Sequence, residues 1–522
     1  MVDTLLYQGS TIGELIIVAL GQFRHRVAFK DAGRAVTFGE LEVMIGSAVA
    51  RLEVLGVRKG DAVAQIASNA TELFAIWAAC YIQGYRSVTL QGSSSINDQI
   101  YAVEDSEAAI LIVDDEHLSI GIEINKAIGS KLEVKSHQAG NGEIGSFWAG
   151  AIEPRVPLMT DVNPEDVIRL AYTGGTTGLP KGVMTSSRSL ACAAMHYMAT
   201  QPWEEQIKYL CASPMSHGGG TIMLPVFLKG GCTILQKKFD AGDVIRAIEH
   251  EGVTSMMVVP TMLYALLDHP SISGANLTSM RRILYGAAPT SPTRLREALR
   301  IFGPVFIQSY GQTEAPATVL ILSREDHLSG EDNRLESAGT PYPGISVRLL
   351  DDDCKVVPRG QIGEICVRGP LVMSGYWKKP DLTEEALRGG WLHTGDLAYQ
   401  DERGYFFIVD RKKDMIISGG FNVYPKEIEN ALTLHPAVAS AAVIGVPDEK
   451  WGEAVKAFVV LRPDKNASSE ELIAFTKELK GSMKAPKTVD LVKVLPLTNL
   501  GKVDKKALRE PYWKGAARQV NG

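Results

Sequence analysis

Residues 172–182 read Tyr-Thr-Gly-Gly-Thr-Thr-Gly-Leu-Pro-Lys-Gly, and they follow a mostly apolar run, 167–171, that is typical of a buried strand. Glycines let backbone N–H groups turn toward an anion, threonine hydroxyls add uncharged donors, and a lysine neutralises anionic oxygens. The stretch therefore predicts a phosphate-binding loop after a strand, with a mobile surface turn as the alternative. The candidate phosphate contacts are Thr173, Gly175, Thr176, Thr177, Gly178 and Lys181.

This loop does not have the Walker A pattern. Pro180 stands where that pattern has a glycine before the lysine, and Gly182 stands where it has serine or threonine after the lysine. Protein-kinase signatures are also missing from the sequence. The sequence therefore disfavours a phosphotransferase.

The composition is that of a soluble globular protein larger than one ordinary domain. The chain has 522 residues, of which 45% are hydrophobic and 22% charged, so we expect a large multi-layer body and a smaller unit. The formal net charge of −6 gives no electrostatic reason to expect nucleic acid as a partner.

Cysteine spacing and the sequences at the two chain ends indicate the cellular compartment of the protein. The six cysteines form no Cys-x-x-Cys pair and no His/Cys cluster at metal-ligand spacing, so reduced thiols are expected. The sequence has no basic leader at its N-terminus and no apolar run long enough to span a bilayer, and residues 518–522 match no peroxisomal or prenylation signal. These features predict a cytoplasmic protein. Its oligomeric state stays open, with a homodimer as one arrangement.

Strand-like and helical segments alternate through the middle of the chain. Strands are predicted at 208–213, 232–236, 255–259, 281–285 and 305–308, with helices such as 240–251 and 291–301 between them. This alternation predicts an α/β fold with mainly parallel strands. Ligands of such sheets bind at the carboxyl ends of the strands, so the residues that follow these strands are candidates for ligand contact.

Residues that suit catalysis or ligand binding follow three of these strands. His217 precedes three glycines, 218–220, and is either a catalytic imidazole or a structural hydrogen-bonding group. Residues 286–288, Gly-Ala-Ala, lack bulk and charge, which suits either a flat ring close to the backbone or a tight turn. Residues 310–314, Tyr-Gly-Gln-Thr-Glu, offer an aromatic face, a hydroxyl and a carboxylate that can hold Mg²⁺.

Two further features lie nearer the C-terminus. Asp396 closes the glycine-containing stretch 391–396 and is either a carboxylate that accepts ribose hydroxyls or a helix cap. A charge cluster at 410–414 follows a strand at 405–409 and predicts a junction between a domain of residues 1–411 and a small α+β domain of residues 412–522. That domain is predicted to hold a helix at 425–434, strands at 438–446, 454–461 and 489–495, and a capping box at 468–471.

Taken in order, these motifs resemble those of the adenylate-forming superfamily, which comprises acyl-CoA synthetases, luciferases and the adenylation domains of peptide synthetases. The resemblance spans nearly the whole chain and rests on the joint order of six motifs. It departs from the usual phosphate loop at Gly174, where the family has serine, so one hydroxyl is missing there. The resemblance implies a large N-terminal domain that binds ATP and the acyl group, and a small, mobile C-terminal domain.

The resemblance also implies a role for each motif residue. Thr313 contacts the α-phosphate, Glu314 binds Mg²⁺, and His217 lies between the acyl pocket and the pantetheine path. Lys181 and Lys502 are catalytic cations, and Lys413 is the hinge. The remaining nucleotide and CoA contacts are Gly286, Ala287, Ala288, Tyr310, Gly311, Gln312, Asp396, Arg411, Gly419 and Gly420, of which Gly286, Ala287 and Tyr310 flank the adenine and Gly419 and Gly420 line the pantetheine tunnel.

The implied reaction has two steps and uses ATP, Mg²⁺ and coenzyme A. A carboxylate attacks the α-phosphate of ATP and expels pyrophosphate, and the CoA thiolate then attacks the resulting acyl-adenylate. Lys502 serves the first step and would obstruct the thiol in the second, so the small domain must present two faces in turn.

The acid is predicted from the candidate pocket, which is apolar. Residues 212–216 lack the aspartate that amino-acid-activating relatives carry, and no carrier-protein segment follows in the sequence given, so a free acid and CoA are favoured. The pocket favours a medium- or long-chain fatty acid, with an aryl or phenylpropanoid acid as the alternative. Its residues outside the motifs above are Met215, Gly218, Gly219, Val259, Met262, Ala315 and Pro316. A luciferase-like oxygenase and a non-catalytic acyl or nucleotide binder are the competing classes.

Overall fold

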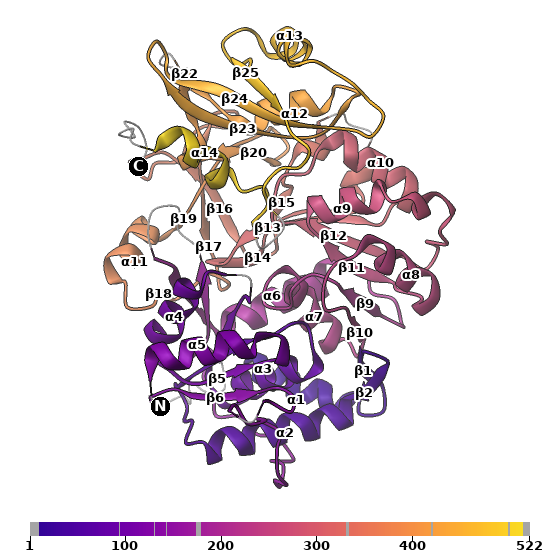
Figure 1. Ribbon diagram of the computed structural model, residues 1–522, viewed down its shortest axis with the longest axis vertical. Coiled ribbons are helices and arrows are strands. Elements are labelled where there is room, and N and C mark those ends of the chain that lie inside the picture. The colour runs from indigo at the N-terminus through magenta and orange to yellow at the C-terminus, as the bar shows by residue number, and fades with distance from the viewer. Residues whose placement is uncertain are drawn as a thin grey trace.

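The structure, a computed structural model, describes residues 10–514 except 93, 130, 142, 174–178, 330–332, 419–420 and 499–501 (Figure 1). The phosphate-loop residues Gly175, Thr176, Thr177 and Gly178 and the loop residues Gly419 and Gly420 lie outside this part of the chain. The described strands form four sheets. Three of the sheets use strands up to Arg411, and the fourth begins at Ile416.

The largest sheet has nine strands and carries most of the predicted strand ends. Its strands pair in parallel from β1 through β10, β9, β11 and β12 to β13, and the flanking pairs are antiparallel. In spatial order they are β15 (Thr340–Pro341), β14 (Ala315–Leu322), β13 (Phe306–Gln312), β12 (Arg282–Gly286), β11 (Ser255–Val258), β9 (Lys208–Cys211), β10 (Cys232–Leu235), β1 (Val27–Asp31) and β2 (Arg34–Thr37).

The second sheet has seven strands, and two of them, β7 and β8, flank the predicted phosphate-binding loop. Strand β7 leads into that loop, and β8 returns from it as its antiparallel partner, with Thr173 opposite Lys181. In spatial order the strands are β18 (Gly375–Tyr376), β8 (Lys181–Ser186), β7 (Val167–Thr173), β4 (Arg86–Leu90), β3 (Ala62–Ile66), β5 (Ala108–Val113) and β6 (Glu133–Ser136). The α/β prediction with mainly parallel strands is confirmed for these two sheets.

Helices join these two sheets through one apolar core. Buried side chains of α1, α2, α3, α6 and α7 pack with strands of both sheets, including Phe29 and Ile168. The helices of this part are α1 (Ile12–Gln22), α2 (Phe38–Val54), α3 (Thr71–Gln83), α4 (Ile96–Asp105), α5 (Leu118–Ile128), α6 (Ser187–Thr200), α7 (Gly218–Leu228), α8 (Ala241–Glu251), α9 (Pro260–Leu267), α10 (Pro292–Phe302) and α11 (Pro380–Ala386). Among the helices of the described residues, none is long and apolar enough to traverse a bilayer.

Local sequence sets several of these boundaries. Thr37 and Glu40 form a capping box at the start of α2, as their spacing predicts, and Gly84 ends α3 in the left-handed region with φ 72°. The N-cap of α3 is Ala70, whose methyl group cannot form a hydrogen bond. Asp31 Oδ2 instead accepts the Thr71 N–H at 3.0 Å.

The third sheet is antiparallel, and of its strands only the one at 405–409 was predicted, which is observed as β20. Its strands are β16 (Ser346–Leu350), β17 (Gly363–Arg368), β19 (Leu392–Gln400) and β20 (Phe406–Arg411). Asp396 therefore lies within a strand, and the helix-cap interpretation of this residue is wrong. Residues 310–314 likewise differ from a simple strand end, because β13 runs to Gln312 and turns directly into its antiparallel neighbour β14.

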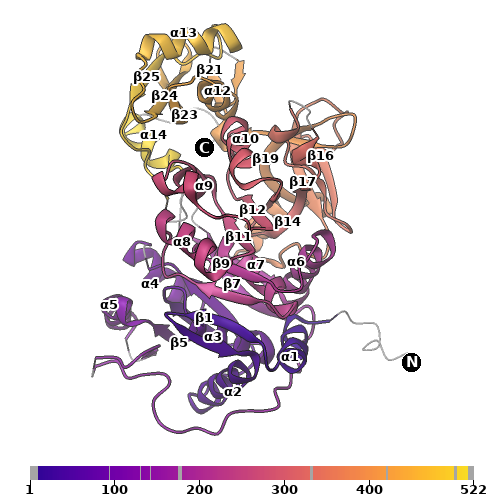
Figure 2. The same cartoon turned by 90° about the vertical axis from the view of Figure 1, so that its right-hand side faces the viewer.

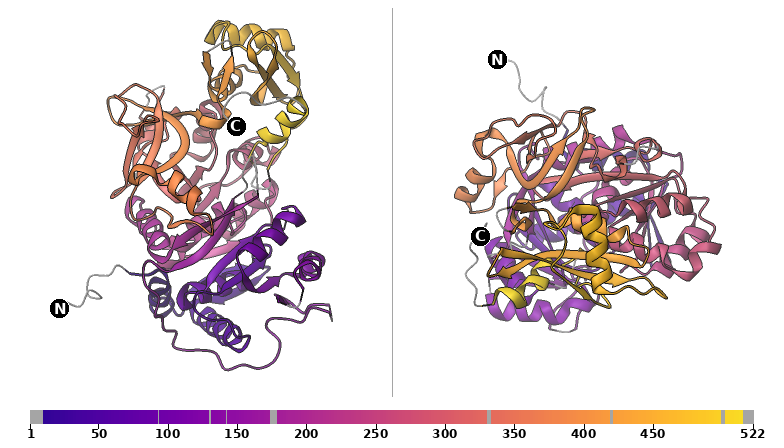
Figure 3. Two further views of the ribbon diagram at one scale, coloured as in Figure 1. Left: turned by 90° about the vertical axis from the view of Figure 1, so that its left-hand side faces the viewer. Right: turned by 90° about the horizontal axis from the view of Figure 1, so that it is seen from above.

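The fourth sheet forms the small C-terminal unit, yellow in Figure 1 and at the top of Figure 2. The helices α12 and α13 pack on it, and Ser468 and Glu471 form the expected capping box. The strand expected at 489–495 ends at Leu491. The elements are η7 (Lys412–Asp414), β21 (Ile416–Ser418), β22 (Phe421–Val423), α12 (Pro425–Thr433), β23 (Val438–Asp448), β24 (Gly452–Leu461), α13 (Ser469–Lys480), β25 (Thr488–Leu491) and α14 (Lys505–Trp513). The left-hand view of Figure 3 shows this unit above the larger body.

Candidate active site

A central cleft of about 1750 Å³ lies between the C-terminal unit and the larger body. The fold brings predicted residues from all four sheets and their loops onto its walls. They are Thr173, Lys181, His217, Gly286, Ala287, Ala288, Tyr310, Gly311, Gln312, Thr313, Glu314, Asp396, Arg411, Lys413 and Lys502. Residues spread over more than three hundred positions of sequence therefore share one solvent-accessible space.

Asp396 is the centre of a hydrogen-bonded group on one wall. It is buried, its Oδ2 accepts the Tyr310 hydroxyl at 2.6 Å, and its Oδ1 accepts Arg411 Nε at 3.1 Å. The neighbouring negative charge raises the pKa of Arg411, and burial together with Asp396 raises the pKa of Tyr310 well above its usual value. These hydrogen bonds hold the Asp396 carboxylate, the Tyr310 phenol and the Arg411 guanidinium in fixed positions at the wall of the cleft.

Glu314 forms a second group with a residue that sequence reasoning missed. The Tyr376 hydroxyl donates to Glu314 Oε1 at 2.9 Å, and Met373 N–H donates to the Glu314 carbonyl at 2.8 Å. Lys181 Nζ lies 5.0 Å from the centroid of the Tyr376 ring, within range of a cation–π contact. The carboxylate and the lysine therefore both contact Tyr376, the carboxylate at its hydroxyl and the lysine over its ring.

The backbone around residues 286–288 leaves little room for side chains. A Cβ on Gly286 would lie 2.3 Å from the Ser309 carbonyl oxygen, so only glycine fits there. Ala287 has φ 65°, in the left-handed region that costs a non-glycine residue about 1–3 kcal/mol. Residues 286–288 line the cleft with no side chain larger than a methyl group, and contact with a flat ring stays a prediction.

His217 is a neutral imidazole. Burial, with Arg169 and Lys502 nearby, lowers its pKa to about 3. Its Nδ1 lies 3.0 Å from Gln91 Nε2 and 2.8 Å from Ser216 Oγ. An imidazole held in this way can accept or donate a hydrogen bond but carries no charge at neutral pH.

The loop that holds His217 depends on Asn69, a second residue missed from the sequence. The buried Asn69 side chain donates from Nδ2 to the carbonyls of Ser213 and Gln236, both at 2.9 Å, and accepts the Met215 N–H at 2.8 Å. Its contacts lie 144 to 167 residues away in sequence, and no local pattern reveals them.

Lys502 reaches the cleft from the C-terminal unit. Burial and the positive charge of Arg411 lower its pKa to about 8, while Asp396 opposes that shift. Its backbone N–H donates to Thr498 Oγ1 at 3.2 Å, and Leu497 forms a β-bridge with its neighbour Val503. Lys502 and the Asp396 group therefore interact electrostatically across the boundary between the two parts.

Lys413 lies in the single turn η7 that joins the third sheet to the fourth. Burial and the adjacent Arg411 lower its pKa. The hinge role of Lys413 stays a prediction.

The residues expected to form the acyl pocket are placed differently. Met215, Gly219, Val259, Met262 and Ala315 are buried, Gly218 and Pro316 are half-buried, and none of the seven belongs to the walls of the central cleft. Gly218 packs against Met257, whose Cε would lie 2.6 Å from an added Cβ. The acyl-pocket assignment of these seven residues therefore stays a prediction.

Comparisons with known proteins agree with this architecture. The chain matches the family description AMP-binding enzyme over residues 18–377 and AMP-binding enzyme C-terminal domain over residues 427–502. Medium/long-chain-fatty-acid–CoA ligase FadD8 of Mycobacterium tuberculosis is 41% identical over 526 residues, which cover 97% of this chain and 91% of that protein. Feruloyl-CoA synthase of an Amycolatopsis species is 38% identical over 490 residues, 94% of this chain and 96% of that protein. Among solved structures, amide bond synthetase McbA from Marinactinospora thermotolerans has a TM-score of 0.89 and 31% identity, covering 96% of this chain and 99% of that one.

Proposed function

Because this chain belongs to the family of AMP-binding enzymes, the adenylate-forming ligases, we propose that it is an AMP-forming acid–thiol ligase. It joins a carboxylic acid to the α-phosphate of ATP, releases pyrophosphate, and transfers the acyl group to coenzyme A. The observation that carries the proposal is that Lys502 of the C-terminal unit shares one cleft with Tyr310, Glu314, Asp396 and Arg411.

The cleft has the groups that the first step requires. The acid is a poor electrophile, so its carboxylate oxygen attacks the α-phosphorus, and negative charge grows on the phosphate oxygens. Lys502, Lys181 and the Thr313 hydroxyl are the proposed donors to those oxygens; one preorganised donor of this kind typically contributes about 3 kcal/mol. Asp396 and Arg411 are proposed to bind the ribose, and the bare backbone at 286–288 to bind the adenine.

Glu314 is the proposed ligand for Mg²⁺. One of its oxygens takes the Tyr376 hydroxyl, and the side chain faces the cleft, which suits an ion that a protein holds by one or two carboxylates together with substrate phosphates. The ion would neutralise phosphate charge when bound. Tyr376 orients the carboxylate.

The second step needs a path for the thiol. We place the domain division between residues 411 and 412, with Lys413 as the pivot that carries Lys502 away and brings Gly419 and Gly420 to the pantetheine path. Neutral His217 then lies between the acyl group and the incoming thiol and can hydrogen-bond either.

The favoured acid is a medium- or long-chain fatty acid. The similarity to a fatty-acid–CoA ligase supports it. The buried side chains of Met215, Met257 and Met262 also support it, because unbranched methionines adapt to an inserted chain. An aryl acid is the second candidate, since a feruloyl-CoA synthase is nearly as similar.

The experiment is a panel of acids from acetate to long-chain fatty acids, with ferulate and coumarate, each incubated with ATP, Mg²⁺ and CoA. Acyl-CoA and AMP are measured by mass spectrometry. The proposal expects the highest kcat/KM for a fatty acid of medium or long chain. Preference for acetate or for ferulate would exclude the fatty-acid assignment, and light emission or O₂ consumption would indicate an oxygenase.

A further inference from the structure

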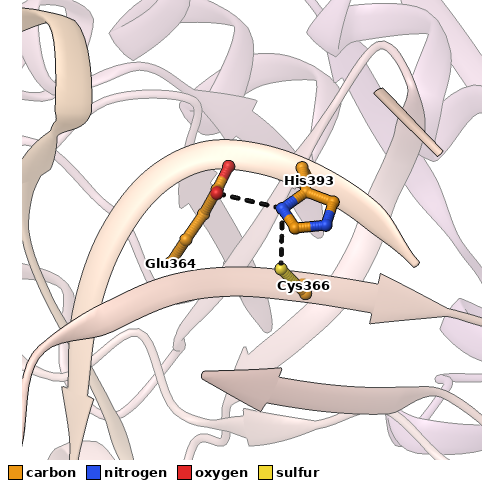
Figure 4. Close-up of side chains that lie close together, drawn as sticks. All are labelled: Glu364, Cys366 and His393. Atoms are coloured by element: carbon orange, nitrogen blue, oxygen red, sulfur yellow. Dashed lines mark hydrogen bonds and ion pairs between the residues drawn. The ribbon is translucent and has the colours of Figure 1, made fainter. Parts of the chain in front are cut away.

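Three side chains with metal-binding atoms converge on one face of the third sheet (Figure 4). Cys366 on β17 is the direct antiparallel partner of His393 on β19, so their side chains lie on the same face. Glu364 lies two residues before Cys366 and shares that face through the alternation of a strand. All three are buried.

The three atoms are spaced almost as ligands of one ion. His393 Nδ1 lies 3.3 Å from Cys366 Sγ and 3.0 Å from Glu364 Oε2. A tetrahedral zinc ion, with Zn–S about 2.3 Å and Zn–N and Zn–O about 2.1 Å, separates N from O by about 3.4 Å and S from N or O by about 3.6 Å. The side chains need to open by only a few tenths of an ångström to admit the ion.

Neighbouring groups hold the ligands in orientation. Cys354 Sγ lies 3.8 Å from His393 Nε2, on the far side of the ring, which leaves Nδ1 to face the cluster. Glu364 Oε1 accepts the Gly395 N–H at 2.9 Å. Contacts of this kind fix the ring and the carboxylate of metal sites in proteins.

The cluster also has a route for an ion. Glu364 and His393 both line the central cleft, so an ion from solvent reaches them without unfolding the sheet. Arg388 Nη2 lies 3.2 Å from Glu364 Oε2, but its side chain is about one-third exposed and can turn outward.

We propose that Glu364, Cys366 and His393 bind a zinc ion, with a fourth position open to water. Sulfur and imidazole ligands favour Zn²⁺ over Mg²⁺, and three protein ligands with one open position are a common zinc arrangement. The Cys366 thiol gives its proton to solvent as the sulfur–zinc bond forms. This ion is distinct from the Mg²⁺ expected at Glu314.

Binding of the ion would affect the position of Asp396 in the proposed nucleotide site, because Glu364 is hydrogen-bonded to the residue before it. Glu364 holds Gly395, and Gly395 precedes Asp396, which bonds Tyr310 and Arg411. An ion that fixes Glu364 therefore restricts the motion of Gly395 on β19 and, with it, of Asp396, the proposed ribose ligand. The competing interpretation is a hydrogen-bonded trio whose carboxylate is neutralised by Arg388.

Cobalt distinguishes these interpretations, because Co²⁺ replaces zinc and gives a thiolate charge-transfer band when sulfur is a ligand. The full chain is stripped with EDTA, desalted and titrated with CoCl₂ under anaerobic conditions, without nucleotide. We expect saturable binding of one ion with a thiolate band, which ZnCl₂ abolishes by displacement. The measurement is independent of ligase activity.

Variants assign the ligands. Cys366→Ser should abolish the thiolate band, and Cys232→Ser, which removes a half-buried thiol on β10 far along the nine-stranded sheet, should leave it unchanged. Cys354→Ser should keep the band and bind about 10-fold more weakly, as expected for loss of a partner behind a ligand. Glu364→Gln keeps an acceptor for Gly395 and should also weaken binding at least about 10-fold, which tests the site if Cys366→Ser does not fold. Absence of a thiolate band in the wild-type chain, or a band retained in Cys366→Ser, would overturn the proposal.

Discussion

Tyr310 and Asp396, which are 86 residues apart in sequence, are joined by a hydrogen bond of 2.6 Å from the phenol to the carboxylate. The bond connects β13, whose residues were expected near the adenine, with β19, whose carboxylate was expected at the ribose. Arg411 completes the group from β20. Two parts of one proposed nucleotide site, carried on different sheets, are thereby fixed relative to each other.

Removal of this bond should weaken nucleotide binding. Tyr310→Phe leaves the ring and deletes the donor to a charged acceptor, a change that costs about 1.5–3 kcal/mol, so the Kd for ATP should rise about 10-fold or more. Isothermal titration calorimetry measures it. Tyr405→Phe is the matched control, because Tyr405 also donates at 2.6 Å to an aspartate, Asp326, away from the cleft. Equal loss in both variants would attribute the effect to stability alone.

The charge of Lys502 should limit activity in alkaline solution. Its pKa is lowered from 10.5 to about 8, so the ammonium is present below pH 8 and is lost as pH rises through that value. We expect kcat/KM for ATP to fall above about pH 8, since this parameter reports groups of the free enzyme. Lys502→Arg should remove that decline, because arginine stays protonated. A decline unchanged in Lys502→Arg would assign it to another group.

His217 should make no contribution to the acidic side of the same profile. With its pKa lowered to about 3, the ring is neutral throughout the range in which histidines usually titrate. His217→Asn should therefore change the rate without shifting any limb of the profile between about pH 5 and 8. Loss of a limb near pH 6.5 in the variant would show that the ring is protonated in the wild type.

Tyr376 should control the magnesium requirement. Tyr376→Phe removes the donor that orients Glu314, and we expect the Mg²⁺ concentration for half-maximal adenylation to rise about 10-fold, with less effect at saturating Mg²⁺. Glu314→Gln should reduce the rate about 10²-fold at every Mg²⁺ concentration. An unchanged Mg²⁺ dependence in Tyr376→Phe, together with a full rate in Glu314→Gln, would place the ion elsewhere.

The sequence predicted those parts of the site that local pattern determines. His217, Gly286 and Tyr310 follow predicted strands of one mainly parallel sheet, and parallel strands end at one edge, so their meeting could be expected. Sequence pattern could not predict the partners Tyr376, Gln91 and Asn69. Each of them contacts its partner across 62 or more residues, through a strand register or a loop that no periodicity marks. The cluster of Glu364, Cys366 and His393 escaped notice for the same reason. It depends on the register of an antiparallel sheet.

The most direct test of the account is acid-dependent exchange of labelled pyrophosphate into ATP, without CoA. The wild-type chain with a fatty acid should exchange label, Lys502→Ala should lose most of this exchange, and Lys493→Ala, at an exposed lysine of the same cleft, should keep it. Lys502→Ala should still convert supplied acyl-adenylate to acyl-CoA. No exchange with any acid, or release of ADP in place of AMP, would contradict the proposed adenylate-forming mechanism.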